Sequence, residues 1–140
     1  MKKVLVTGAN GQLGRCIKDA AINFPLHEFH FVSRDELNID TVEVVRQFFD
    51  QNHFDYCINT AAYTNVEKAE SEPDQAFQTN AEALKNLADV CAKTNTTLIH
   101  VSTDYVFDGK KGASYSEDDQ TNPINVYGAS KLKGEEYVQK

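Results

Sequence analysis

The sequence from residue 4 to residue 14 reads Val4-Leu5-Val6-Thr7-Gly8-Ala9-Asn10-Gly11-Gln12-Leu13-Gly14, and it decides the fold that we expect for the chain. Its first residues form an apolar run rich in β-branched side chains, which is typical of a buried strand. Three glycines at a spacing of three follow, and apolar residues then recur with helical periodicity from Leu13 to Phe24. The stretch therefore predicts a strand, a tight turn and a helix.

A turn of this kind suits a bound phosphate group. Glycines allow positive φ and close approach of the backbone to a ligand, and the first amides of the following helix face an anion. The pattern is G-x-x-G-x-x-G and not the G-x-G-x-x-G of the standard dinucleotide fingerprint, so an ordinary glycine-rich loop is the alternative. Because the turn follows an N-terminal strand, we favour a dinucleotide site.

Composition narrows the class of protein. With 140 residues, 41% of them hydrophobic, the chain is long enough for one domain with its own core. A formal net charge of −7 argues against general affinity for nucleic acid or for an anionic membrane. The N-terminal residues lead directly into the predicted strand, so we expect neither a signal peptide nor a membrane span, and a cytoplasmic protein. Three widely spaced cysteines, Cys16, Cys57 and Cys91, suit buried thiols better than disulfides or a metal site.

Strand and helix patterns alternate along the rest of the chain. We expect strands at residues 4–7, 28–33, 38–40, 54–60 and 97–102, and helices at residues 13–24, 42–49, 74–93 and from 126 onward. Asp40 and Glu43 form a D-x-x-E cap for the second helix. This order predicts an α/β protein with a Rossmann-like, doubly wound parallel sheet that stops after about five strands. The unpaired edge of the last strand favours a homo-oligomer.

Ser33 and Arg34 follow the second predicted strand, where dinucleotide folds meet the adenosine ribose. A guanidinium pairs with a 2′-phosphate and a hydroxyl donates to it, so the two residues favour NADPH. Asp35 comes next, and its carboxylate is able to accept a hydrogen bond from the ribose 2′-hydroxyl of NADH. A solvated surface arginine is the alternative for Arg34.

Two further segments end predicted strands with residues suited to a ligand. Ala61-Ala62-Tyr63-Thr64 has small side chains that leave room for a ligand, although close packing explains them equally well. Asn80 lies on the core-facing stripe of its helix, where it is either a bridge between backbone groups or part of a site. Ser102-Thr103-Asp104-Tyr105 places hydroxyls, a carboxylate and a phenol after the last strand.

Two further interpretations concern this part of the chain. We interpret His100 as a core histidine. We expect residues 108–125 to form a lid on the substrate side.

Tyr127 and Lys131 are four residues apart on one predicted helix, so their side chains share a face. An ammonium group beside the phenol, with a cationic nicotinamide nearby, favours the phenolate and makes the tyrosine a useful proton donor or acceptor. The Y-x-x-x-K spacing is common by chance. It indicates a catalytic pair here because the chain also has the glycine turn, the hydroxyls of Ser102 and Thr103, and Asn80.

Four segments together carry a resemblance to a known family: residues 7–14, 61–70, 102–109 and 123–131. They resemble the extended short-chain dehydrogenase/reductases, and within them the branch that reduces the C4 ketone of dTDP-4-dehydrorhamnose. Glu67 stands where that branch has an aspartate, which weakens a substrate role for this carboxylate. Members of the branch are considerably longer, so the resemblance implies that residues 1–140 are the NAD(P)-binding domain and that a C-terminal substrate domain is absent from this chain.

The resemblance also implies roles for single residues. Thr103 would hydrogen-bond the substrate carbonyl, Tyr127 would protonate its oxygen, and Lys131 would hold the nicotinamide ribose. Asp104 and Tyr105 would contact the substrate beside Thr103. NADPH would be the cofactor, with NADH possible, and no metal is implied. The expected cofactor contacts are Gly8, Asn10, Gly11, Gln12, Leu13, Gly14, Ser33, Arg34, Asn38, Ile39, Ala61, Ala62, Tyr63, Asn80, Tyr127 and Lys131.

Two other functions remain open from the sequence. A nucleotide-sugar epimerase or dehydratase of the same class would keep NAD tightly bound. A non-catalytic regulatory subunit would bind the cofactor without turning over a substrate, although the presence of Thr103, Tyr127 and Lys131 argues against it.

Overall fold

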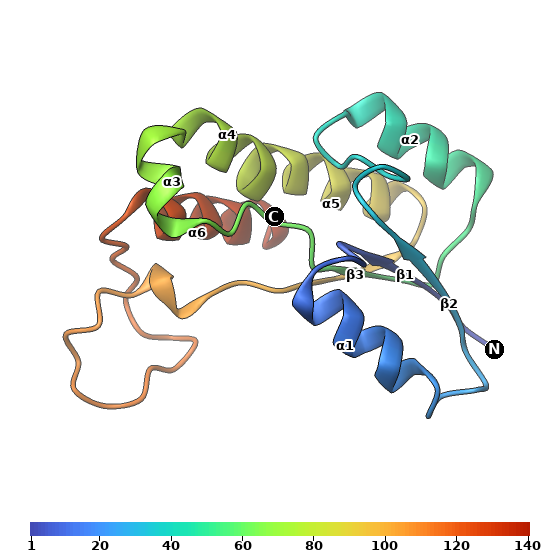
Figure 1. Ribbon diagram of the computed structural model, residues 1–140, viewed down its shortest axis with the longest axis horizontal. Coiled ribbons are helices and arrows are strands. Elements are labelled where there is room, and N and C mark those ends of the chain that lie inside the picture. Colours follow the sequence, from blue (N-terminus) through green and yellow to red (C-terminus); the bar gives the residue numbers. More distant parts are fainter.

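The computed structural model describes residues 1–140, and its centre is one sheet of four parallel strands in the order β2-β1-β3-β4 (Figure 1). The strands are β1 (Lys3–Thr7), β2 (Glu28–Val32), β3 (Tyr56–Asn59) and β4 (Thr97–His100). Val6 of β1 is in register with Phe31 on one side and Ile58 on the other. Because β1 lies between β2 and β3, the loops after β1 and β3 flank the point at which open α/β sheets bind ligands.

Helices lie on both sides of the sheet, which confirms the predicted Rossmann-like, doubly wound class. Helix α1 (Gln12–Ala21) lies alone on one side (Figure 1). The other side carries α2 (Val42–Gln51), α3 (Val66–Ser71), α4 (Pro73–Phe77), the π-helical turn η1 (Gln78–Glu82), α5 (Ala83–Lys93) and α6 (Val126–Val138). A short 3-10 helix, η2 (Asp104–Val106), follows β4. None of these helices has the length and apolar character that a membrane span needs.

The hydrophobic core lies between the sheet and the helices α2 and α5. Leu5 of β1 and Cys57 of β3 have no exposed surface. They belong to one core cluster with Val45 of α2 and Leu87 of α5, which are also fully buried. Phe54, just before β3, is 1% exposed; it packs edge-on against His30 and Phe49 and stacks on Phe48. Burial of these side chains fixes the strand ends from which the site is built.

The face of the sheet that carries α1 is largely open. Only Gly14 of α1 is buried, and Leu13 remains 42% exposed, so the apolar stripe predicted for this helix does not enter a core. Cys16 is exposed as well, contrary to the expectation of three buried thiols, whereas Cys57 and Cys91 are buried. On the same face Ile99 of β4 is 45% exposed, and no strand pairs with the outer edge of β4.

Two local predictions were wrong. Residues 38–40 form a turn and not a strand, which reduces the expected five strands to four. The carboxylate of Asp40 does not cap α2, because it accepts a hydrogen bond from Arg34 instead, and Thr41 takes the N-cap position. The predicted helix over 74–93 is present, but the π-helical turn η1 interrupts it next to Asn80.

Candidate functional site

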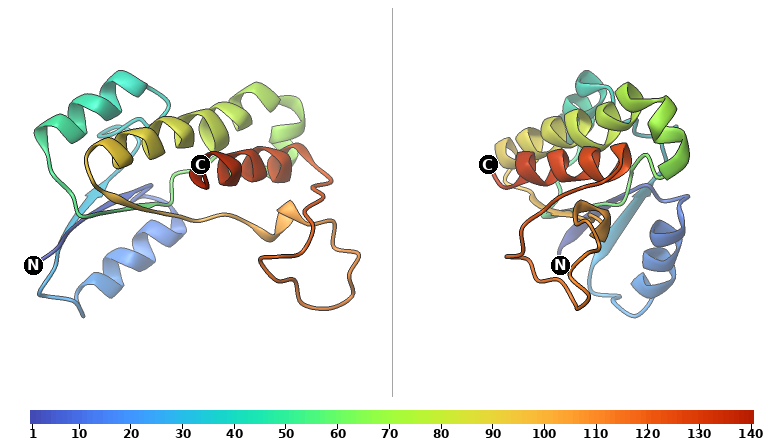
Figure 2. Two further views of the ribbon diagram at one scale, coloured as in Figure 1. Left: turned by 180° about the vertical axis from the view of Figure 1, so that it is seen from behind. Right: turned by 90° about the vertical axis from the view of Figure 1, so that its left-hand side faces the viewer.

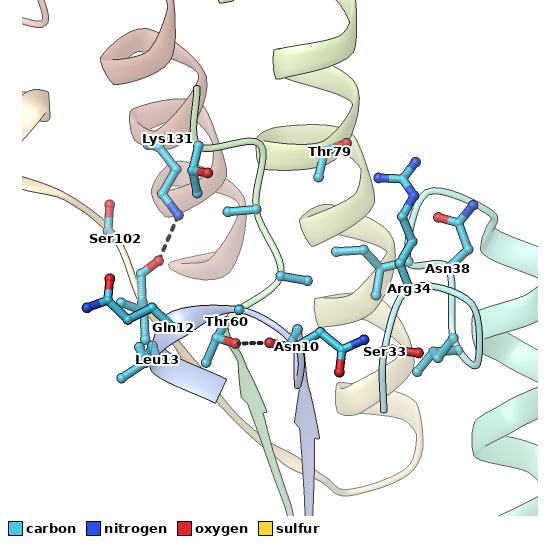
Figure 3. A pocket seen from close by; sticks show the side chains of 18 of the residues that line it. Asn10, Gln12, Leu13, Ser33, Arg34, Asn38, Thr60, Thr79, Ser102 and Lys131 are labelled. Atoms are coloured by element: carbon cyan, nitrogen blue, oxygen red, sulfur yellow. Dashed lines mark hydrogen bonds between the residues drawn. The ribbon is translucent and has the colours of Figure 1, made fainter. Parts of the chain in front are cut away.

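A cavity of about 750 Å³ opens at the carboxyl ends of the strands (Figure 3). This volume is typical of a pocket for a small molecule. Arg34 and Asn38 lie at one end of the cavity, and Ser102 and Lys131 lie at the other (Figure 3). Of the residues expected to contact a cofactor, those that line it are Gly8, Asn10, Gly11, Gln12, Leu13, Ser33, Arg34, Asn38, Ile39, Ala61, Ala62, Tyr127 and Lys131.

The glycine turn packs directly against the segment that follows β3. Gly8 has φ +67°, and a Cβ atom there would lie 2.6 Å from Oγ1 of Thr60 and 2.7 Å from the amide nitrogen of Ala61. The Thr60 hydroxyl donates a 2.7 Å hydrogen bond to the main-chain oxygen of Thr7. At Gly14 a Cβ atom would lie only 2.3 Å from the Gly8 carbonyl oxygen. Glycine is therefore required at positions 8 and 14 for the turn and α1 to approach this closely.

The start of α1 offers free amides to the cavity. The Gly11 amide donates to the oxygen of Gly8, and the Arg15 amide donates to the oxygen of Gly11, both at 3.0 Å. Between these two bonds, the amides of Gln12, Leu13 and Gly14 have no acceptor within the protein. Free amides and the positive end of the helix dipole together make a site for an anion.

Arg34, at the β2 end of the cavity, already has an acidic partner. Its Nη2 atom lies 2.8 Å from Oδ2 of Asp40. The Arg34 side chain is 65% exposed, whereas the Asp40 side chain is only 12% exposed. The neighbouring Ser33 hydroxyl donates to the Glu36 carboxylate at 3.1 Å. Asp35 also lines this end of the cavity, so acidic and basic groups meet there.

Lys131, at the other end, is buried. The residue is 3% exposed, and its Nζ donates a 2.8 Å hydrogen bond to the main-chain oxygen of Val101. Burial lowers the pKa of Lys131 to about 8, against an opposing effect of the Glu135 carboxylate. Glu135 also accepts a hydrogen bond from the hydroxyl of Ser102. Contacts between α6 and the segment after β4 thus hold Lys131 at the cavity wall.

Tyr127 lines the same cavity as Lys131, as their spacing on α6 predicts. The ring of Tyr127 is partly buried and packs edge-on against Tyr105, with 5.7 Å between the ring centroids. Gly128 allows this part of α6 to approach η2, because a Cβ atom there would lie 2.3 Å from the Tyr105 carbonyl oxygen. Packing of α6 on the segment after β4 therefore positions the phenol.

Asn80 is a bridge between backbone segments. It is 2% exposed, its Oδ1 accepts from the Tyr63 amide at 2.8 Å, and its Nδ2 donates to the Tyr63 oxygen at 2.9 Å. The same Nδ2 donates to Oγ of Ser130 at 3.0 Å. Neither Asn80 nor Tyr63 lines the cavity. These hydrogen bonds give Asn80 a positioning role, in which it ties the segment after Ala61 and Ala62 to α6.

Other predicted residues lie apart from the cavity. Gly14 lies behind the turn, and Thr103 caps the N-terminus of η2, where its Oγ1 accepts from the Tyr105 amide at 3.2 Å. Asp104 and Tyr105 line a second hollow of about 310 Å³, which they share with the loop residues Asp108, Gly109, Tyr115 and Ile124. The loop over residues 108–125 projects away from the sheet (Figure 2) and contributes nothing to the first cavity, so it does not cover the cofactor end.

Sequence reasoning missed several residues of the cavity wall, including Cys16, Leu37, Thr60 and Thr79. Thr60 was predictable as a site residue, because it directly follows a strand. Thr79 had none, since it is one polar residue within a long helical segment. Asp40 was also missed as the partner of Arg34, because the D-x-x-E spacing suggested a helix cap.

Comparison with known proteins places these features in context. A family model described as the RmlD substrate binding domain matches residues 1–140. The chain is 39% identical over 135 residues to dTDP-4-dehydrorhamnose reductase of Aggregatibacter actinomycetemcomitans. The matched region covers 96% of this chain and 46% of that protein. Among solved structures, a dTDP-4-dehydrorhamnose reductase ortholog of Clostridium acetobutylicum has a TM-score of 0.94 and 39% identity, covering 98% of this chain and 49% of that one.

The dTDP-4-dehydrorhamnose reductase of Bacillus anthracis, solved in complex with NADP, also has a TM-score of 0.94, with 36% identity over 99% of this chain and 49% of that one. The chain thus spans about half the length of the relatives that it matches.

Proposed function

Because the chain belongs to the family of the RmlD substrate binding domain, we propose that it is the cofactor-binding part of an NADPH-dependent reductase that converts dTDP-4-dehydrorhamnose to dTDP-rhamnose. One observation carries the proposal: a single cavity runs from Arg34, past the free amides of the glycine turn, to Tyr127 and Lys131. Residues 1–140 are then the NAD(P)-binding domain, and a C-terminal substrate domain completes the enzyme outside this chain.

The residues of the cavity fit a phosphorylated dinucleotide. The amides of Gln12 and Leu13 suit the pyrophosphate, because they have no acceptor in the protein and lie at a helix N-terminus. The guanidinium of Arg34 is 65% exposed and suits a 2′-phosphate at the β2 end. Lys131 and Tyr127, at the other end of the cavity beyond Ala61 and Ala62, would then hold the nicotinamide.

The reduction needs a hydride and a proton. When bound, NADPH supplies the hydride to C4 of the sugar. Tyr127 gives its phenolic proton to the ketone oxygen, so that the ketone becomes a hydroxyl group and the phenolate remains on the protein. The nearby ammonium of Lys131 stabilises that phenolate and holds the nicotinamide ribose. Thr103 donates to the ketone oxygen from the segment after β4, and Asp104 and Tyr105 contact the sugar nucleotide from the second hollow.

The proposal is tested by following NADPH oxidation in the full-length protein with dTDP-4-dehydrorhamnose as substrate. We expect turnover that requires both compounds. Absence of turnover, together with activity on a UDP-hexose, would reject the substrate. An absorbance spectrum of the purified protein separates the epimerase alternative, which would carry tightly bound NAD. Binding of NADPH without turnover of any nucleotide sugar would favour a regulatory subunit.

A further inference from the structure

Asp40 lies behind Arg34, at the end of the cavity that we assign to the 2′-phosphate, and the inference drawn from it rests on the proposed function. We propose that Asp40 is a specificity-determining residue of the cofactor site. Its carboxylate offsets the charge of Arg34 and thereby lowers the preference of the site for NADPH over NADH.

The Asp40 carboxylate is fixed by its neighbours. Its Oδ2 atom accepts hydrogen bonds from Arg34 at 2.8 Å, from the Thr79 hydroxyl at 3.1 Å and from the Gln75 amide at 3.5 Å. The Asp40 amide donates to Oδ1 of Asn38 at 3.0 Å. Arg34, Asn38 and Thr79 all line the cavity (Figure 3), so the carboxylate stands directly behind its wall.

Only one of the groups around this carboxylate is charged. The Asp40 side chain is 12% exposed, and its Oδ1 atom is buried without any hydrogen-bond partner. A carboxylate oxygen that has lost water and gained no donor is poorly compensated. The guanidinium of Arg34 therefore serves as the main counter-charge of Asp40 before any ligand is present.

Arg34 is able to bind a phosphate without leaving Asp40. A guanidinium has five N–H donors in one plane, and Asp40 accepts from Nη2 alone. The other donors remain for the cavity, from a side chain that is 65% exposed. A 2′-phosphate that accepts from these other donors would lie across the guanidinium plane from the Asp40 carboxylate.

The two dinucleotides respond differently to this arrangement. The 2′-phosphate of NADPH is attracted by Arg34 and repelled by Asp40, whereas the 2′-hydroxyl of NADH carries no charge. The net attraction for NADPH is therefore weaker than an unpaired arginine would give. An alternative is that Asp40 merely orients Arg34, and this predicts a change of opposite sign when the carboxylate is removed.

Asp40→Asn separates the two cases, because the amide keeps an oxygen for Arg34 and Thr79 but has no charge. We expect the ratio of the Kd for NADH to the Kd for NADPH to rise by roughly three- to tenfold. Arg34→Ala should lower the same ratio. Asp50→Asn is the matched control, since it removes an identical charge from an exposed position at the end of α2 and should leave the ratio unchanged.

The measurement is calorimetric titration of NADPH and NADH into the full-length protein and its variants. A ratio of two affinities in one protein is insensitive to the fraction that is folded, and Asp40→Ser repeats the test with a smaller polar residue. An unchanged or lower ratio in Asp40→Asn, or an equal rise in Asp50→Asn, overturns the inference while the proposed function stands. A wild-type protein that binds neither dinucleotide overturns both.

Discussion

The ammonium nitrogen of Lys131 lies 2.8 Å from the main-chain oxygen of Val101, and this hydrogen bond ties α6 to the end of β4. The two residues come from segments that are 30 positions apart in the sequence. Both line the candidate cofactor cavity, so the charge of Lys131 is already in place at its wall. A pre-positioned cation needs no rearrangement when a ligand arrives, which favours tight and oriented binding.

Lys131 should titrate within a range that is accessible to experiment. Burial lowers its pKa from 10.5 to about 8, so the folded protein binds fewer protons than the unfolded chain between these values. The stability linked to Lys131 is therefore fully present above the unfolded pKa and is lost as the pH falls through the folded pKa. Relative to Lys131→Met, the wild-type free energy of unfolding should rise by on the order of 2 kcal/mol from about pH 8 to pH 10.

Urea unfolding of both proteins across this pH range measures the difference. Lys133→Met is the control, because the pKa of this lysine is raised by its hydrogen bond to Glu136. A difference between wild type and Lys131→Met that does not vary with pH would show that Lys131 titrates as an ordinary surface lysine.

Tyr127→Phe should lower kcat of the full-length enzyme by at least about 100-fold and leave the affinity for the cofactor almost unchanged. The substitution keeps the ring that packs against Tyr105 but removes the phenolic proton. Stopped-flow measurement of NADPH oxidation, with a separate titration of the cofactor, gives the two quantities. Near-normal kcat would mean that another group delivers the proton.

Local patterns in the sequence predicted the two ends of the cavity. The glycines from Gly8 to Gly14 and the spacing of Tyr127 and Lys131 depend on backbone geometry within a single element, which one sequence is enough to show. The alternation of strands and helices then placed both ends at the carboxyl edge of one sheet. The fold class followed from the same alternation.

Contacts between distant segments were not predictable in this way. From the sequence, Asn80 was either a bridge between backbone groups or part of a site. Its hydrogen bonds to Tyr63 and Ser130 show that it is a bridge. Asp40 had the spacing of a helix cap, but a nearby guanidinium is a stronger partner for a carboxylate than a helix amide is. The exposed stripe of α1 was misjudged, because periodicity reports which face is apolar and not whether another element covers it.

Gly14→Ala should destabilise the protein by roughly 1–3 kcal/mol, because the added methyl group would overlap the main chain of the turn. Its Cβ atom would lie 2.3 Å from the Gly8 oxygen and 2.8 Å from Cα of Ala9. Gly11→Ala is the matched control, since its Cβ atom would lie 3.3 Å from the same oxygen. Chemical denaturation of the two variants measures the effect, and equal losses would show that close approach at Gly14 is not what limits stability.

A protein limited to residues 1–140 has an unprotected sheet edge and an open apolar face. The outer edge of β4 has no partner strand, and Ile99 and Val101 beside it are 45% and 38% exposed. Leu13 of α1 is 42% exposed on the same side of the sheet. Edges of this kind pair with other chains unless charge or another element covers them.

This protein should therefore associate with itself, bind NADPH weakly and turn over no substrate. The amides of the glycine turn and Arg34 are present for the cofactor, but we expect the second hollow of about 310 Å³ alone not to hold a sugar nucleotide in reacting geometry against Tyr127. Sedimentation velocity should show dimers or larger species, and Ile99→Lys should shift the distribution towards monomer, because a lysine on an edge strand opposes pairing. Val44→Lys on α2, at a residue with 39% exposure, is a control for added charge and should not change the distribution. Monomers at all concentrations would show that the edge of β4 is not a pairing surface. Robust turnover by this protein would show that residues 1–140 are sufficient for catalysis.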